Sequence, residues 1–236
     1  MTTPLPRPAT GDPLRGWAPA GALLGVGWWL VGGVIGIVVR FGVPTPAELL
    51  VDVNGARGVW VAAMGLQTAQ QILLVPFLLA LLAALRPTDS LQVVALAAFG
   101  FSAVCFAISG IVHGVFGVHQ AADTTDIAEL TAAQIDLATV THAIADTSYF
   151  AGIVATAVAT GFALERMRRL GGFPAHLLRI GWVAVVCHGL QFGWFFVAAM
   201  GGFGAAGGVL QGLWFIAMAR WLSSDETVRS TRVSLS

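Results

Sequence analysis

His142 and Asp146 share one apolar stretch of the chain and have the types and spacing for acid–base chemistry. Positions four apart lie on the same face of an α-helix, so the imidazole and the carboxylate can hydrogen-bond. A carboxylate behind a histidine fixes the ring and raises its basicity. An acid in an apolar environment favours its protonated form, which suits a general acid. We interpret Asp146 as a candidate catalytic acid and His142 as its partner; the alternative is a hydrogen-bonded clamp between helices.

Other polar side chains fall inside apolar stretches, where they are expensive and usually face the interior of a helical bundle. At a rise of about 1.5 Å per residue, most of them lie in the half of the membrane nearer the outside. This distribution predicts an enclosed polar pocket that binds a ligand. The residues expected to line it are His188, Gln191, Gln67, Gln71, Gln211, His113, Tyr149 and Trp194.

The aromatic content favours a lipophilic small molecule as the ligand. The chain has 8 Trp and 14 Phe but 1 Tyr. Aromatic faces stabilise cations, which would suit proton-initiated cyclisation of an isoprenoid. The sequence leaves open whether the protein is an enzyme at all.

Two alternatives to the lipophilic ligand stay open. In the first, the histidines of three consecutive apolar stretches, His113, His142 and His188, bind a haem or a metal ion. The helical rise puts His113 and His142 at similar depth and His188 roughly 10 Å deeper. In the second, the protein is an accessory subunit of a membrane complex, and its polar side chains only pack helices together. The preferred interpretation assigns no metal ligand and identifies no cofactor.

The composition indicates a membrane protein. Hydrophobic residues make up 57% of the chain and charged residues 10%, against about 45–50% and about 25% in a soluble domain. A transmembrane helix needs about 20 mostly apolar residues. We therefore expect an all-α polytopic membrane protein with a six-helix transmembrane domain over residues 17–222, between tails 1–16 and 223–236. The expected spans are residues 17–40, 59–85, 91–118, 138–165, 177–200 and 203–222.

The placement of arginine predicts the orientation of the bundle. If the N-terminus is cytoplasmic, Arg40 and Arg57 alone among the 12 arginines fall outside. Cytoplasmic loops carry the excess of positive charge, so both tails are expected in the cytoplasm. The chain has no lysine and is rich in Ala, Gly, Val and Arg, which suggests a bacterial genome and hence the inner membrane of the cell.

Several function classes are excluded by counting. The lack of lysine removes a P-loop lysine and a pyridoxal or retinal Schiff base. The net charge of +0 gives no electrostatic footprint for nucleic acid. Small-residue repeats such as Gly204/Gly208/Gly212 favour packing within one bundle over a dimer interface. The expected partners are therefore the bilayer and a lipophilic small molecule, with oligomerisation open.

A basic loop joins the fourth and fifth expected spans. It reads LERMRRLGGFP at residues 164–174 and is followed by LLRIGW at residues 177–182. Physically it is a positive-inside anchor with a glycine–proline helix stop. Together with PFLLAL at residues 76–81, it resembles uncharacterised six-helix bacterial membrane proteins. The resemblance implies the six-helix fold and gives no activity and no catalytic residue.

Overall fold

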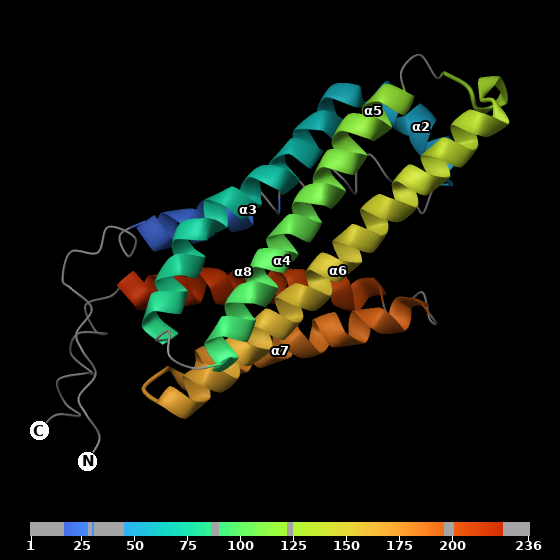
Figure 1. Cartoon of the computed structure of the whole chain (residues 1–236). Coiled ribbons are helices and arrows are strands. Elements are labelled where there is room, and N and C mark those ends of the chain that lie inside the picture. The colour runs from blue at the N-terminus through green and yellow to red at the C-terminus, as the bar shows by residue number, and fades with distance from the viewer. Residues whose placement is uncertain are drawn as a thin grey trace, which may run out of the picture. The chain divides into compact units, whose positions relative to one another are not determined.

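The computed structural model of the chain describes residues 17–27, 30, 45–85, 90–121, 125–195 and 201–223. Every regular element among them is helical (Figure 1), which confirms the all-α class. In chain order they are a helix at Trp17–Gly27, α2 (Pro46–Gly55), α3 (Arg57–Leu85), α4 (Ser90–Ile111), a π-helical turn (Val112–Phe116), α5 (Gly117–Gln120), a 3-10 turn (Ile127–Glu129), α6 (Ala132–Leu170), α7 (Ala175–Gln191), a 3-10 turn (Phe192–Phe195) and α8 (Gly201–Ser223).

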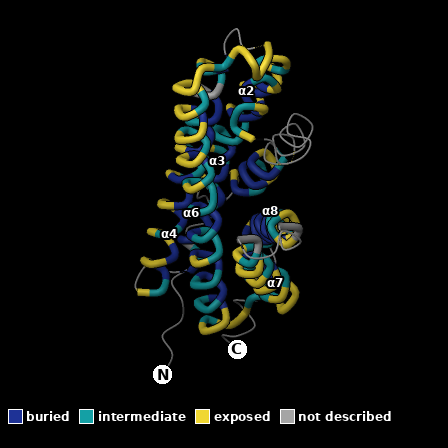
Figure 2. Tube along the Cα trace, turned by 90° about the vertical axis from the view of Figure 1, so that its right-hand side faces the viewer, coloured by how far each residue is buried: buried dark blue, intermediate teal, exposed yellow. Residues whose placement is uncertain are grey.

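Three helical stretches are long and apolar enough to cross a membrane: Arg57–Leu82, Ser90–Gln120 and Ala132–Leu170. Exposed residues lie along several helices (Figure 2). They include large apolar ones, for example Phe101 and Val140. Exposed apolar surface of this kind is compatible with contact to lipid. Parts of two further expected spans, residues 28–29, 31–40 and 196–200, lie outside the described residues, as do most of both tails.

The chain packs as two compact units, each described here by itself. Unit 1 comprises Met1–Val26, Leu73–Phe99 and Thr156–Ser236, and unit 2 comprises Gly27–Ile72 and Gly100–Ala155. The boundaries fall within α3, α4 and α6, so each of these helices contributes residues to both units.

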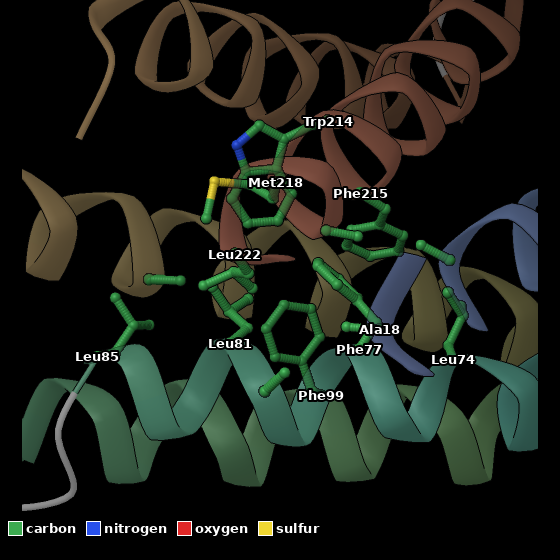
Figure 3. Close-up of a cluster of buried hydrophobic side chains, with 14 of the residues drawn as sticks. Ala18, Leu74, Phe77, Leu81, Leu85, Phe99, Trp214, Phe215, Met218 and Leu222 are labelled. Atoms are coloured by element: carbon green, nitrogen blue, oxygen red, sulfur yellow. The ribbon is translucent and has the colours of Figure 1, made fainter. Parts of the chain in front are cut away.

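The core of unit 1 is a cluster of buried apolar side chains from the helix at Trp17–Gly27, α3, α4, α6, α7 and α8 (Figure 3). The ring centroid of Phe215 lies 5.1 Å from that of Phe77 and 6.4 Å from that of Phe99. Trp214 and Met218 are completely buried beside them. Lipid is as apolar as this core, so such packing would stabilise a membrane bundle mainly through van der Waals contact.

Helices α7 and α8 lie side by side in unit 1 (Figure 1). The connection from α6 to α7 turns at Gly171 and Gly172, whose φ angles are +70° and +76°. Both angles lie in the left-handed region that glycine adopts without strain. The helix stop expected from the sequence therefore lies at these two residues.

Short helix α2 was not predicted from the sequence, although its signal is present. Thr45 accepts a hydrogen bond from the Glu48 N–H, and the Glu48 carboxylate accepts one from the Thr45 N–H at 2.7 Å. With Pro46 in the first turn, the sequence Thr-Pro-Ala-Glu is a capping box followed by a helix. A similar pair caps α6: Thr131 directly precedes the helix and Gln134 lies in its first turn, so α6 begins before the expected residue 138.

Candidate functional site

His142 and Asp146 lie one turn apart on α6, and their side chains meet. Asp146 Oδ2 lies 3.1 Å from His142 Nε2. The regular geometry of the helix is sufficient to bring them together, as the spacing predicts.

A second histidine reaches the same place from another helix. His113 Nε2 lies 3.2 Å from His142 Nδ1 and 3.7 Å from Asp146 Oδ1. All three residues belong to unit 2, and we call them the His–His–Asp cluster. It connects the end of α4 to α6.

His113 lies in the π-helical turn Val112–Phe116. A π turn adds one residue to a helical turn and changes where its side chains point, and such turns often occur at functional sites. Trp60 of α3 fixes this turn by donating its indole N–H to the His113 carbonyl oxygen at 2.9 Å. The two rings also meet edge to face, with centroids 6.0 Å apart.

Two glycines let α3 approach the His113 turn closely. A Cβ atom on Gly110 would lie 2.5 Å from Thr68 Oγ1, and one on Gly114 would lie 2.9 Å from Met64 Cβ. Gly110 and Gly114 form a small-xxx-small pair, which allows close contact between helices. Neither glycine was among the residues expected at the site, although their spacing can be read from the sequence.

The contacts of the cluster are consistent with one set of histidine tautomers. His142 can donate from Nε2 to the Asp146 carboxylate and accept at Nδ1 from the Nε2–H of His113. His113 is buried, His142 is partly buried, and the Asp146 side chain is 38% exposed. The exposed side of the carboxylate is where a ligand could approach.

The same atoms also fit a metal ion. Each residue offers one ligand atom, and these atoms lie within 4.8 Å of one another, the one such group among the described residues. Zinc binds imidazole nitrogen at about 2.0–2.1 Å, so two ligands at a tetrahedral angle lie roughly 3.4 Å apart. The 3.2 Å and 3.7 Å separations from His113 Nε2 are close to that value.

Tyr149 lies on α6 beyond the cluster and packs against α4. Its ring meets Phe106 edge to face at a centroid distance of 5.4 Å. Nearby, Ser102 donates a hydrogen bond to the Gly152 carbonyl oxygen at 2.9 Å. These contacts hold α4 and α6 together farther along α6, on the C-terminal side of Asp146.

The remaining candidates from the sequence separate into two groups. Gln67 and Gln71 lie partly buried on α3 in unit 2, where Gln70, which we did not select, is the buried glutamine. His188, Gln191 and Gln211 belong to unit 1. The structure therefore groups His113 and His142 with Asp146, and describes His188 in a different setting. The side chain of Trp194 lies outside those described.

Comparison with known proteins gives no relative: no family model, curated protein or solved structure matches the chain. The described fold and site define an all-α protein with membrane-type helices and a His–His–Asp cluster.

Proposed function

We propose that the protein is a six-span protein of the bacterial cytoplasmic membrane, with both termini in the cytoplasm, that binds a divalent transition-metal ion at the His–His–Asp cluster. The observation that carries the proposal is the convergence of three ligand atoms from α6 and the His113 turn within 4.8 Å. The geometry of α6 explains why His142 and Asp146 contact each other. It does not explain the position of His113, the third ligand, which depends on the π turn and its hydrogen bond with Trp60.

The ligand set indicates the class of metal. Two imidazole nitrogens and one carboxylate oxygen suit first-row ions such as Zn²⁺ and Fe²⁺ and are poor ligands for Ca²⁺ or Mg²⁺. Three protein ligands leave at least one position open, which is typical of sites where the metal also binds a small molecule. The partly exposed Asp146 side chain leaves one side of the cluster accessible.

Electrostatics also favours a bound cation. An ionised carboxylate is expensive within a membrane unless it is paired. As metal ligands, His113 and His142 are neutral, so a divalent cation bound between them would itself supply the charge that neutralises Asp146. The ion would thus offset the cost of placing this acid in a transmembrane helix.

A second candidate function is acid–base chemistry on a lipophilic molecule without a metal. The three side chains form a hydrogen-bonded chain, Asp146–His142–His113, and such a chain can hold a proton and transfer it. The aromatic pair Tyr149–Phe106 belongs to the same compact unit as this cluster. Native mass spectrometry would show a stoichiometric organic adduct in that case and a metal-sized adduct in the first.

Elemental analysis of the full chain, purified in a mild detergent without chelator, tests the metal site. We expect a near-stoichiometric transition metal in the wild type and its loss in His142→Ala and Asp146→Asn. His119→Ala and His176→Ala are matched controls, because both histidines are exposed and lie outside the cluster. They should keep the metal.

The proposal is overturned if the folded wild type contains no metal and takes up neither Zn²⁺ nor Fe²⁺ on titration. Size-exclusion chromatography and circular dichroism establish that each variant is folded. His113→Gln, which keeps a polar side chain of similar size, repeats the test if His142→Ala does not fold.

A further inference from the structure

Positive charge is in excess in unit 1, which the metal site does not use. The described residues of this unit carry five arginines and one acidic residue, Glu165. Three of the arginines lie near the C-terminus of α6, one lies in the first half of α7 and one in the last turn of α8. In chain order they are Arg166, Arg168, Arg169, Arg179 and Arg220.

The packing of α7 against α8 brings these arginines to one end of the unit. Phe173, just before α7, packs against Trp221 near the end of α8, with ring centroids 4.7 Å apart. Farther along, a Cβ atom on Gly207, near the start of α8, would lie 2.9 Å from Nδ1 of His188, near the end of α7. The two helices therefore run antiparallel. Because only residues 171–174 separate α6 from α7, the C-terminus of α6 lies at the same end.

The length of α6 indicates the depth of its last arginines in a membrane. The helix has 39 residues, which span about 58 Å at about 1.5 Å per residue. The hydrocarbon core of a bilayer is about 30 Å thick, and each headgroup layer adds roughly 5–8 Å. The fourth expected span ends at residue 165. Arg168 and Arg169 then lie about 4–6 Å beyond the hydrocarbon, at the depth of the lipid phosphates.

Glu165 holds these two arginines in place. Arg168 donates from Nε and Nη2 to the two carboxylate oxygens, at 2.7 Å and 2.8 Å. Arg169 donates from Nε to Glu165 Oε1 at 2.8 Å. A guanidinium group has five N–H donors, so Glu165 uses two from Arg168 and one from Arg169. The two arginine side chains remain 64% and 56% exposed, so their other donors are accessible to a ligand.

A phosphate group matches two arginines fixed in this way. The planar fork of N–H donors on a guanidinium fits phosphate oxygens, and donors that are already ordered bind at a lower entropic cost. Basic residues next to a transmembrane helix attract anionic lipids. We propose that Arg168 and Arg169 bind the phosphate of an anionic lipid such as phosphatidylglycerol. The depth of the two arginines favours a lipid over free phosphate. The inference is independent of the metal and rests only on the membrane location proposed above.

Native mass spectrometry of the full chain in detergent, titrated with phosphatidylglycerol or with phosphatidylcholine of the same acyl chains, tests the proposal. We expect tighter binding of phosphatidylglycerol. The double variant Arg168→Gln/Arg169→Gln should lower that affinity roughly 10–30-fold, because each basic residue near an anionic lipid contributes about fivefold. Arg179→Gln/Arg220→Gln is the matched control. It removes the same charge from exposed positions and leaves the Glu165 contacts intact, so it should lower the affinity much less.

Three results would overturn the proposal. Equal binding of the two lipids means that the site does not recognise an anionic headgroup. An equal loss in the two double variants means that total charge acts and that no site exists at Arg168 and Arg169. Displacement of phosphatidylglycerol by millimolar inorganic phosphate means that the arginines bind free phosphate. Circular dichroism checks that each variant is folded. If the first double variant does not fold, Arg169→Gln alone carries the expectation of a loss, because it keeps the two Arg168–Glu165 hydrogen bonds.

Discussion

The indole N–H of Trp60 donates a hydrogen bond to the main-chain carbonyl of His113, across 2.9 Å and 53 positions of sequence. Trp60 is almost completely buried and is not itself a candidate ligand. It fixes the backbone of the π turn that presents His113 to α6. The geometry of the His–His–Asp cluster therefore depends on a residue of a third helix.

Replacing Trp60 with phenylalanine should weaken the metal site without unfolding the protein. The substitution keeps an aromatic ring against His113 and removes the one donor. Groups that orient metal ligands typically affect affinity by about 10–100-fold, and we expect a loss of that size for Trp60→Phe. Competition with a chromogenic chelator measures it. Trp182→Phe changes an exposed tryptophan and should leave the affinity unaltered.

Removing the metal should lower the thermal stability of the wild type. A ligand that binds only the folded state stabilises it by about 2.7 kcal/mol when its free concentration is about 100 times Kd. Differential scanning fluorimetry should thus show a lower unfolding midpoint after EDTA treatment and recovery on adding Zn²⁺. In Asp146→Asn, EDTA should have little effect. An equal effect of EDTA on both proteins would point to a different binding site.

The sequence could predict the contact between His142 and Asp146, because residues four apart lie on the same face of a helix and that spacing can be read directly. The estimate of similar depth for His113 and His142 was a hint that these rings could meet. Their contact needs the π turn and the Trp60 hydrogen bond, and neither leaves a periodic pattern in the sequence.

In the fold as well, properties of single helices could be predicted from the sequence, whereas contacts between helices could not. Apolar length predicted six spans, and three of them correspond to helices that are long and apolar enough to cross a membrane, because that property belongs to each helix separately. The other three spans, including residues 203–222 in α8, stay a prediction. Helix α2 was missed although Thr45 and Glu48 form a readable capping box. The antiparallel register of α7 and α8 depends on which side chains fit against Gly204 and Gly207, and no local pattern specifies it.

The stability of α2 should depend on pH through Glu48. Hydrogen bonds from the Thr45 backbone N–H, and secondarily from its hydroxyl, lower the pKa of Glu48 below its ordinary value of 4.5. A lowered pKa in the folded state means that the carboxylate stabilises the helix above the unfolded pKa and stops doing so as the pH falls. Amide hydrogen exchange in residues 46–55 should therefore show weaker protection in acid. Glu48→Gln should remove most of that pH dependence, and unchanged dependence would contradict the cap.

Two glycines of α4 provide a matched test of the close helix contact behind His113. A Cβ on Gly110 would lie 2.5 Å from Thr68 Oγ1 and 3.2 Å from the Met64 carbonyl oxygen, whereas a Cβ on Gly100 would meet nothing within 4 Å. Gly110→Ala should therefore force α3 and α4 apart, at a cost of about 1–3 kcal/mol, as overpacked cores show. Gly100→Ala should be neutral or stabilising by up to about 1 kcal/mol, because alanine favours the helix.

The same pair of variants relates helix packing to the site. Displacing α3 moves Trp60 away from the His113 carbonyl, so Gly110→Ala should lose metal affinity as well as stability. Gly100→Ala should keep both. Unfolding in detergent gives the stability, and chelator competition gives the affinity. If Gly110→Ala loses stability but binds metal as tightly as the wild type, the Trp60 hydrogen bond does not position His113 in the way proposed.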